Sequence, residues 1–405
     1  MIAGTPVLDL DDVASLEAAD SGGTLRSAAS GGAQVRATAA AIGEDALARL
    51  GGLRPRSVVL VSGAGRAARA AALLVAALGD RAGLPIVPVT AIPQWVGPLD
   101  VVLVAGDDAG DPRLIGAVDR ALKRGAEVVI ATPDEGPLRA AAAGRAAMLP
   151  PRVRVLEHNR LLRFLAVGIA VLRAVDPSHI GPLVPDLDAL ADVLDAEAMR
   201  DGPHNEVFHN PAKTLAARMQ ERRIVLSGDS PAAAEVAGHG AEVLLQAAGQ
   251  IAAAAHLADA VAANSRMSEA ANVAAPGYDP LFHDEQLDGP APVDRVRVFV
   301  VSAETDQVAA GRRLAVFGAS AGLVDADLVN VDVGLMSTEA TVPRDPETLV
   351  SETVPEQQPG PGRGGELEQL AVLILRLEMA AAYLRLLGGP SAGSDRPAHY
   401  DGGHY

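Results

Sequence analysis

The chain has no cysteine and very few aromatic residues. None of its 405 residues is cysteine, and Phe, Trp and Tyr together make up 2% of the chain. Without cysteine the protein has no disulfides, no cysteine-containing zinc site and no cysteine nucleophile. Because 49% of the residues are nevertheless hydrophobic, the core must consist mainly of Ala, Val and Leu. Such a core suits sheets that are covered by closely packed helices.

Long hydrophobic runs and an excess of positive charge are missing as well. The longest apolar helical stretch, 161–172, is interrupted by Arg163 and is too short to span a bilayer. Residues 1–20 are acidic and contain no basic segment followed by an apolar one, so we expect no signal peptide. The net charge of −17 disfavours nucleic acid, because few cations would neutralise its phosphates. We therefore expect a soluble, cytoplasmic protein with neither a membrane nor a nucleic acid as partner.

Runs of β-branched residues alternate with Ala-rich segments in the first half of the chain. The runs predict strands at 57–62, 101–104, 127–130 and 152–155, and the segments between them predict helices up to Leu78, at 111–124 and at 161–173. Continuous apolar strands with helices between them are typical of a parallel sheet that is buried on both faces.

The same alternation restarts after a proline-rich connection. Beyond it the pattern predicts strands at 223–228, 295–302 and 325–333, an Ala-rich helical region up to Ala263, and helices at 305–317 and 367–387. A chain of this length suits two domains better than one. The predicted layout is a first domain over 1–175, a connection over 176–204, a second domain over 205–390 and a disordered tail over 391–405.

The last predicted helix has an apolar stripe along one face. Its members recur at helical spacing: Leu370, Leu373, Ile374, Leu377, Ala381 and Leu384. The stripe predicts that the protein is a homodimer, with this helix in the interface or across the junction between the domains. Burial of the helix within one subunit is the alternative.

Two loops of the first half follow predicted strands and carry candidate binding groups. In Ser62-Gly-Ala-Gly65 the glycines and the following helix favour an anion such as a phosphate, or simply make a tight turn. The dinucleotide motif GxGxxG is incomplete there, which disfavours a nucleotide. In Gly106-Asp-Asp-Ala-Gly110 the two carboxylates either bind a cation or cap the next helix, and their charge is wrong for phosphate.

The nine histidines show no spacing typical of metal ligands, and we expect no metal and no cofactor. His283 is of interest because it is followed by Asp284 and Glu285. Carboxylates beside a histidine tune it for proton transfer. A polar loop without a chemical role is the alternative.

Three segments of the second half share motifs with a known family. They are Asn210-Pro-Ala-Lys213 before the strand at 223–228, the loop Phe282-His-Asp-Glu285, and the helix over 370–387 with its Tyr-Leu-Arg-Leu-Leu ending. These segments resemble the bifunctional phosphoglucose/phosphomannose isomerases, and the chain layout is similar to the actinobacterial branch of that family. The resemblance implies an α/β fold with two sugar isomerase (SIS)-like parallel-sheet halves, each a three-layer αβα arrangement, and a C-terminal helix.

The resemblance also implies a set of site residues. His283 matches the ring-opening histidine of the family, and Glu269 and Glu285 are the candidates for the catalytic carboxylate. Candidate substrate-binding residues are Ser62, Gly63, Gly65, Ser227, Gly228 and Lys213. The chain departs from the family in two places. Its 106–110 loop lacks the phosphate-binding hydroxyls, and Glu269 stands in Ser-Glu-Ala-Ala-Asn rather than in Glu-Asn-x-Lys.

Two functions remain open at this point, and both have a sugar phosphate as ligand. One is an aldose–ketose isomerase that converts glucose 6-phosphate or mannose 6-phosphate to fructose 6-phosphate. The other is a catalytically degenerate SIS protein with a binding or regulatory role in mannose metabolism. His283 in its family-like loop favours the first, and the missing phosphate hydroxyls favour the second.

Overall fold

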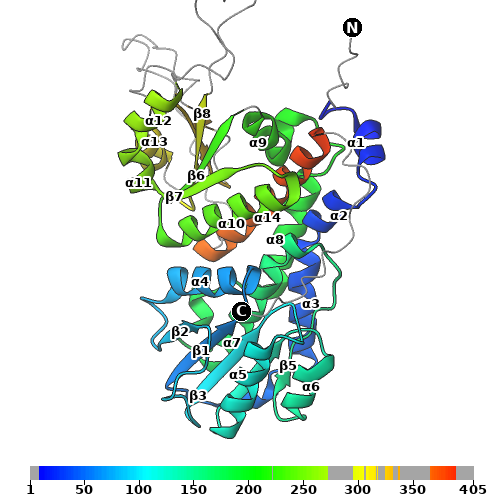
Figure 1. Cartoon of the computed structure of the whole chain (residues 1–405), viewed down its shortest axis with the longest axis vertical. Helices are drawn as coiled ribbons and strands as arrows, with labels where there is room; N and C mark the ends of the chain where they lie inside the picture. The colour runs from blue at the N-terminus through cyan, green and yellow to red at the C-terminus, as the bar shows by residue number, and fades with distance from the viewer. Residues whose placement is uncertain are drawn as a thin grey trace, which may run out of the picture.

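The structure is a computed structural model. It describes residues 9–220, 222–271, 295–304, 307–315, 317, 324–331, 336–337 and 365–388. Two five-stranded sheets, each covered by helices, lie toward opposite ends of an elongated molecule (Figure 1). The protein is thus an α/β protein of two three-layer halves with a C-terminal helix, as the sequence predicts.

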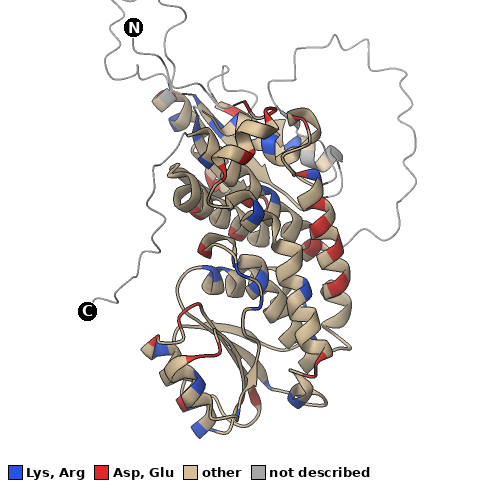
Figure 2. Cartoon of the chain, turned by 90° about the vertical axis from the view of Figure 1, so that its right-hand side faces the viewer, with Lys and Arg blue, Asp and Glu red and all other residues tan. Residues whose placement is uncertain are grey.

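The first half is built on a fully parallel sheet of the order β2-β1-β3-β4-β5. Its strands are β1 (Ser57–Ser62), β2 (Ile86–Val89), β3 (Asp100–Ala105), β4 (Glu127–Ala131) and β5 (Ala147–Met148). Its covering helices are α4 (Arg66–Leu78), α5 (Pro112–Lys123), α6 (Gly136–Ala142) and α7 (Leu161–Val175). The charged residues of this half lie on helices and loops, and its strands carry only Asp100 and Glu127 (Figure 2).

Successive side chains of a strand point to opposite faces of the sheet, and each face has its own core. Val58 and Leu60 of β1 belong to the core that includes α4 and α7. Val59 and Val61 belong to the core that includes α5 and α6. Because both faces need apolar side chains, the strand sequence is continuously apolar rather than alternating.

The fifth strand lies at a different place from the one predicted. The prediction of a strand at 152–155 is wrong, because β5 is formed by Ala147 and Met148, which pair with Val129 and Ile130 of β4. The residues that follow β5 include two prolines at 150–151, which lack the N–H groups that a sheet ladder requires. The alternation in Arg152-Val-Arg-Val155 therefore belongs to a loop.

The second half repeats the same strand order with one antiparallel edge. Its sheet runs β7-β6-β8-β9-β10, and only β10 is antiparallel among the described strands. The strands are β6 (Arg223–Gly228), β7 (Ala252–His256), β8 (Val296–Val301), β9 (Val324–Val329) and β10 (Met336–Ser337). The helices of this half are α9 (Pro211–Met219), α10 (Pro231–Ala248), α11 (Leu257–Ala262), α12 (Asn264–Ala271) and α13 (Gln307–Ala315).

One strand of the second sheet interrupts a region predicted to be helical. The Ala-rich region up to Ala263 contains α10, then β7, then α11, so the prediction of one helical region is wrong over 252–256. The turn residue Gly249 has a φ of 67°, in the left-handed region that glycine adopts readily, and it ends α10. Four successive alanines then pair with β6, because strand formation depends on neighbouring strands more than on intrinsic propensity.

The C-terminal helix α14 (Glu366–Leu387) lies in the middle of the molecule (Figure 1). It packs against α9 and α10 of the second half and against α2 (Thr24–Ala29) and α8 (Leu187–Arg200). Its residues are buried on all sides, including Arg376 and Glu378. The prediction that only one face of this helix is buried is therefore wrong. Its apolar stripe packs against other helices of the same chain, at the junction of the two halves. A homodimer remains a prediction.

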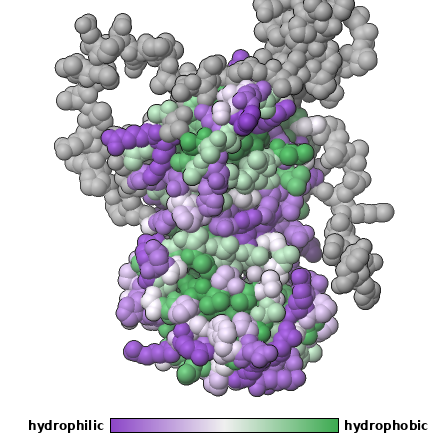
Figure 3. Space-filling view, turned by 60° about the vertical axis from the view of Figure 1, so that its left-hand side comes forward, coloured by the Kyte–Doolittle hydropathy of each residue, from purple (hydrophilic) through white to green (hydrophobic). Residues whose placement is uncertain are grey.

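Helices α4 and α10 meet directly between the two sheets. Arg69 of α4 binds Glu235 of α10 at 2.5 Å, and both Arg69 and Arg66 bind Glu242. Arg66 also donates to Gln246 at 2.7 Å. The surface at the junction between the two halves is largely hydrophilic (Figure 3). Paired charges thus join the halves along one side of the junction.

The predicted connection over 176–204 contains α8, which is packed rather than free. Helix α8 lies along α3 (Gly31–Gly43), and Arg36 of α3 binds Asp192 and Asp195 of α8. Helix α1 (Val13–Ala19) precedes α2 and α3 at the start of the described chain. The proposed domain boundaries remain predictions. No helix among the described residues combines the length and the apolar character that a membrane span requires.

Candidate functional site

The first candidate site lies where the order of the first sheet reverses. The chain leaves β1 toward β2 on one side and later returns to β3 on the other, so β1 and β3 flank the switch point. Ligands of open parallel sheets bind beyond the carboxyl ends of the strands at such a point. The loop Ser62–Gly65 after β1 and the loop Gly106–Asp111 after β3 therefore face this position together.

The loop after β1 brings three of the predicted binding residues to the N-terminus of α4. Gly65 has a φ of 77° and a ψ of −137°, which only glycine adopts readily, and this turn starts the helix. The N–H of Gly63 donates to the carbonyl of Ala105 at 3.0 Å, which ties the loop to β3. Ser62 is half-buried. A helix N-terminus next to exposed backbone favours an anion.

The carboxylates of the loop after β3 are all engaged by other groups. Asp107 forms an ion pair with Arg160 at 2.9 Å, and Asp108 accepts a hydrogen bond from the N–H of Gly110 at 2.7 Å. Asp111 rather than Asp107 or Asp108 caps the next helix, because it accepts from the N–H of Arg113. Burial opposes ionisation of Asp111, but the hydrogen bonds from Arg113 keep its pKa below the ordinary value.

Arg160 and Arg163 were not predicted as site residues. Arg163 is buried and donates to the carbonyls of Ala131 and Leu149, both at 3.1 Å. Burial lowers the pKa of Arg163 to about 10, and the charge of Asp107 opposes this effect. The signal in the sequence is the arginine that interrupts the apolar stretch 161–172, since a buried charge needs polar partners. Its partners here are carbonyl groups at the ends of β4 and β5.

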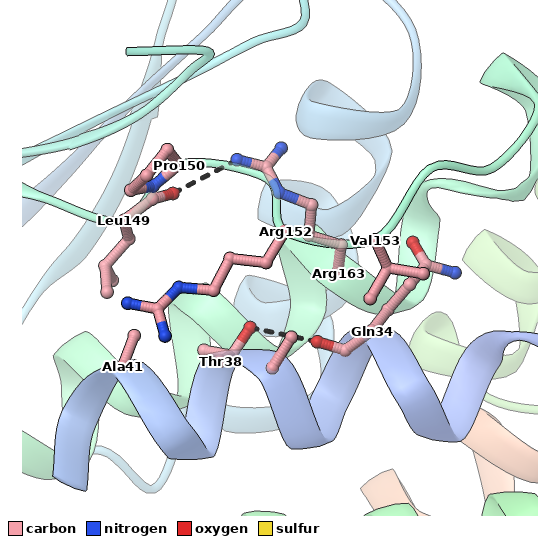
Figure 4. Close-up of a pocket in the computed structure, with 9 residues that line it drawn as sticks. Gln34, Thr38, Ala41, Leu149, Pro150, Arg152, Val153 and Arg163 are labelled. Atoms are coloured by element: carbon pink, nitrogen blue, oxygen red, sulfur yellow. Dashed lines mark hydrogen bonds between the residues drawn. The ribbon is translucent and has the colours of Figure 1, made fainter. Parts of the chain in front are cut away.

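The pocket beside Arg163 is too small for a sugar. Figure 4 shows Arg163 with its hydrogen bond to Leu149, above α3 and its residues Gln34 and Thr38. The cavity volume is about 10 Å³. That is room for about one water molecule. A ligand of the first half would thus bind over the loops 62–65 and 106–111, and not in this pocket.

The corresponding edge of the second sheet is closed by protein atoms. A Cβ atom added to Gly228 would lie 2.0 Å from the backbone nitrogen of Ala234, so the glycine allows α10 to pack against the end of β6. Ser227 is buried, and its hydroxyl has no hydrogen-bond partner among the described residues. Arg313 binds Asp229 at 2.6 Å beside them. This geometry favours a packing role for Ser227 and Gly228.

Lys213 and the motif around it form the start of α9. The side chain of Asn210 accepts a hydrogen bond from the N–H of Lys213 at 2.9 Å, and Pro211 occupies the first turn. The ammonium of Lys213 is buried and donates to the carbonyls of Pro203 and Asn205, both at 2.7 Å. Burial lowers its pKa. These contacts hold the turn before the helix, which favours a structural role for the motif.

Of the three predicted catalytic residues, the structure describes only Glu269. Glu269 lies on α12 of the second half with 63% of its side chain exposed, and it binds Arg266 at 2.6 Å. His283 and Glu285 lie outside the described residues. Within the described chain, no group of three or more His, Asp or Glu side chains is arranged to hold a metal ion.

Comparison with known proteins identifies the fold. No protein-family model matches the sequence, and neither does any curated protein. Among solved structures, a protein of Silicibacter pomeroyi assigned as a phosphosugar isomerase superposes with a TM-score of 0.56 at 16% identity, covering 89% of this chain and 96% of the other. The tagatose-6-phosphate ketose/aldose isomerase of Escherichia coli gives 0.56 at 13% identity, covering 91% and 94%. A protein of Clostridium difficile assigned as a phosphosugar isomerase gives 0.57 at 9% identity, covering 93% and 96%.

These superpositions extend over nearly the whole of both chains. At identities this low they establish a shared fold, and the fold is that of the SIS phosphosugar isomerases, as the sequence resemblance implies. The assignment to the actinobacterial branch of the phosphoglucose/phosphomannose isomerases remains a prediction.

Proposed function

We propose that this protein binds a sugar phosphate at the carboxyl edge of the first sheet. The observation that carries the proposal is the loop Ser62–Gly65, which joins β1 to the N-terminus of α4 at the switch point of the sheet. This is the position at which parallel sheets bind ligands and at which a helix attracts a phosphate. The phosphosugar isomerases among the structures of the same fold support a sugar phosphate as the ligand.

Binding without turnover is the function that the local charges support best. An acid–base catalyst needs a pKa near the working pH and a free hydrogen-bonding position. Asp111 has a lowered pKa and caps α5, and Asp107 is engaged by Arg160. Glu269 is exposed on another part of the chain and pairs with Arg266. Asp107 and Asp111 are therefore both engaged by other groups, which favours binding over acid–base catalysis at this edge.

The test uses the ion pair between Asp107 and Arg160. The substitution Asp107→Ser removes a negative charge from the loop and releases the guanidinium of Arg160 toward the switch point. Two like charges about 4 Å apart repel by about 1 kcal/mol in a water-like medium, so binding of glucose 6-phosphate or mannose 6-phosphate should tighten roughly fivefold or more. Asp119→Ser is the matched control, because Asp119 also forms one ion pair, with Lys123, but lies outside the loop.

Isothermal titration calorimetry with both sugar phosphates measures the effect. The proposal requires that Asp119→Ser binds like the wild type and that Asp107→Ser binds more tightly. It fails if neither the wild type nor Asp107→Ser binds either sugar phosphate. Equal affinities for all three proteins would show that the loop 106–111 does not face the ligand.

Isomerisation of the bound sugar is the second candidate function. It is favoured by the loop Phe282-His-Asp-Glu285, which resembles the family loop with the ring-opening histidine. A positioned acid–base group contributes roughly a hundredfold or more to the rate, so His283→Ala should remove most of any turnover. Glu269→Gln tests the base in the same way. A coupled assay measures conversion of both hexose 6-phosphates to fructose 6-phosphate by the wild type and the two variants. If the folded wild type shows no turnover, isomerisation is excluded. If turnover survives His283→Ala, the assignment of His283 as a catalytic residue is refuted.

A further inference from the structure

The second sheet has an unpaired edge along β7. This strand pairs with β6 on one side (Figure 1), and no described strand pairs with it on the other. Ala253 and Ala254 are both exposed, although successive residues of a strand point to opposite faces of the sheet. The strand therefore extends beyond the helices that cover the sheet. Its outward N–H and C=O groups form a template on which another strand can pair.

Both edges of the first sheet carry features that prevent such pairing. The edge strand β2 contains Pro88, which is exposed and has no N–H group to donate. The other edge strand, β5, is only two residues long. Strand β7, in contrast, has five residues and contains neither a proline nor an Asp, Glu, Lys or Arg. Because native proteins usually block a sheet edge that makes no contact, the unblocked edge of β7 indicates an interaction surface.

Two large apolar side chains lie close to this strand in the sequence. Ile251 directly precedes β7 and is 83% exposed, and Leu245 of α10, a helix that packs against β7, is 56% exposed. Exposed apolar side chains that gather at one place mark a surface for protein–protein contact. We call the surface formed by Leu245 and residues 251–256 the β7 edge.

The β7 edge is uncharged in a strongly acidic protein. Because the net charge is −17, two copies of the chain repel each other, and their contact requires a surface without acidic side chains. The sequence from Val243 to Ala258 contains no Asp, Glu, Lys or Arg. In a twofold-symmetric interface the same surface of both copies meets, so any charge near the axis would face its own like charge. The β7 edge avoids this repulsion.

A second copy of the chain fits this edge better than an unrelated peptide. Domains that bind a peptide strand at a sheet edge derive their specificity from pockets for alternate side chains. Four successive alanines, at 252–255, have side chains too short to form such pockets. Two identical strands need no pockets, because a twofold axis at the middle of β7 places Ala254 opposite its own copy and Ala252 opposite His256.

The area that a dimer requires shows which other residues take part. A stable, specific interface buries about 800 Å² on each partner. The five residues of β7, at about 3.3 Å each, give an edge only roughly 17 Å long. Such an edge supplies only part of the area, so Leu245 and Ile251 must be buried as well.

We propose that the β7 edge is the interface of a homodimer, in which the β7 strands of two copies pair antiparallel around a twofold axis at Ala254. The second sheets of the two copies then form one continuous sheet, and Leu245 and Ile251 of both copies are buried beside the axis. The interface contains none of the first-half loops. It is therefore independent of the proposed sugar-phosphate site.

The absence of cysteine from the chain allows a direct test of this geometry. Opposite residues of an antiparallel pair have Cα atoms about 4.5 to 5.5 Å apart, a distance that a disulfide spans. On oxidation by air, Ala254→Cys should therefore form a disulfide-linked dimer that is seen by electrophoresis without reductant. Ala140→Cys is the matched control, because Ala140 is also exposed but lies on α6 of the first half. It should give no comparable dimer.

Sedimentation equilibrium of the full-length chain measures the dissociation constant of the dimer. Ala254→Glu brings two carboxylates together at the axis, and Ile251→Ser removes an apolar contact from both copies, so each should weaken the dimer roughly tenfold or more. The controls make the matching changes at exposed positions of the first half: Ala140→Glu, and Leu99→Ser at a side chain that is 65% exposed. Both should dimerise like the wild type. Added salt should strengthen the wild-type dimer, because it screens the repulsion between the two acidic copies.

Three results would overturn the proposal. They are a wild type that sediments as a monomer at all concentrations, cross-linking of Ala254→Cys no greater than that of Ala140→Cys, and equal dissociation constants for Ala254→Glu and Ala140→Glu. Circular dichroism of each variant checks that the fold is retained. Because Ala254 is exposed, its substitution by the small side chain of cysteine should leave the monomer folded, so the cross-linking result stands even if Ala254→Glu proves unstable.

Discussion

Glu378 is a carboxyl group without contact with solvent, at the junction of the two halves of the molecule. Its Oε1 lies 2.8 Å from Nε2 of His239 on α10, and its Oε2 accepts a hydrogen bond from the side chain of Asn159 at 2.9 Å. The hydroxyl of Ser27 donates to Asn159 at 2.8 Å and extends this chain to α2. The substitution Glu378→Gln keeps the shape of the side chain and its hydrogen-bonding capacity but removes the group that ionises.

Burial raises the pKa of Glu378 to about 8, although the hydrogen bond from Asn159 and the charge of Arg66 oppose this effect. In the unfolded chain the group ionises near its ordinary value of 4.5. Between these two values only the folded protein holds the proton, so the free energy of unfolding falls as the pH rises. The two pKa values differ by about 3.5, and each tenfold change in proton affinity corresponds to about 1.4 kcal/mol. The loss of stability therefore approaches roughly 5 kcal/mol by about pH 8.

The measurement is urea unfolding followed by circular dichroism between about pH 5 and pH 8. Relative to Glu378→Gln, the wild type should lose roughly 4 kcal/mol across this range. Burial also lowers the pKa of His239, which destabilises the protein as the pH falls below 6.5, but both proteins share this contribution. Glu366→Gln, the same change at the half-buried first residue of α14, should run parallel to the wild type. If the Glu378→Gln profile is also parallel, Glu378 is ionised in the folded protein and forms an ion pair with His239, and the argument from burial is refuted.

Two further predictions concern packing at the ends of α10 and α14. Gly228→Ala places a Cβ atom 2.0 Å from the backbone of α10 and should lower the free energy of unfolding by roughly 3 kcal/mol or more. Gly63→Ala is the control and should change it little, because the nearest neighbours of its Cβ atom would be 3.9 Å away. Equal unfolding midpoints for the two variants would contradict this prediction. Tyr383→Phe removes the buried hydrogen bond that the hydroxyl of Tyr383 donates to the carbonyl of Asp201 at 2.7 Å. It should lower the free energy of unfolding by about 1 kcal/mol. An unchanged Tm would show that this hydrogen bond contributes nothing to stability. A third prediction, the homodimer, is checked by sedimentation, and a monomer at all concentrations would refute it.

The sequence alone determined the class of fold and the three central strands of each sheet. The runs Val58–Val61 and Ile224–Leu226 are apolar at every position, because each strand is covered by helices on both faces. The first loop of the candidate site was predicted from its glycines, which follow a predicted strand and precede a predicted helix. Local patterns of this kind act within a few residues, so they can be recognised without the tertiary structure.

Tertiary structure decided what depends on residues that are distant in the chain. Ala252–His256 forms a strand only because β6 lies beside it, although its alanines favour a helix. The apolar stripe of α14 was visible, but burial of its other faces depends on four helices from both halves. In the same way, Asp107 forms an ion pair with Arg160, and Arg200 and Arg218 line one cavity. Charge pairing and cavities arise from the distances between side chains in space, and the spacing of residues along a single segment does not contain that information.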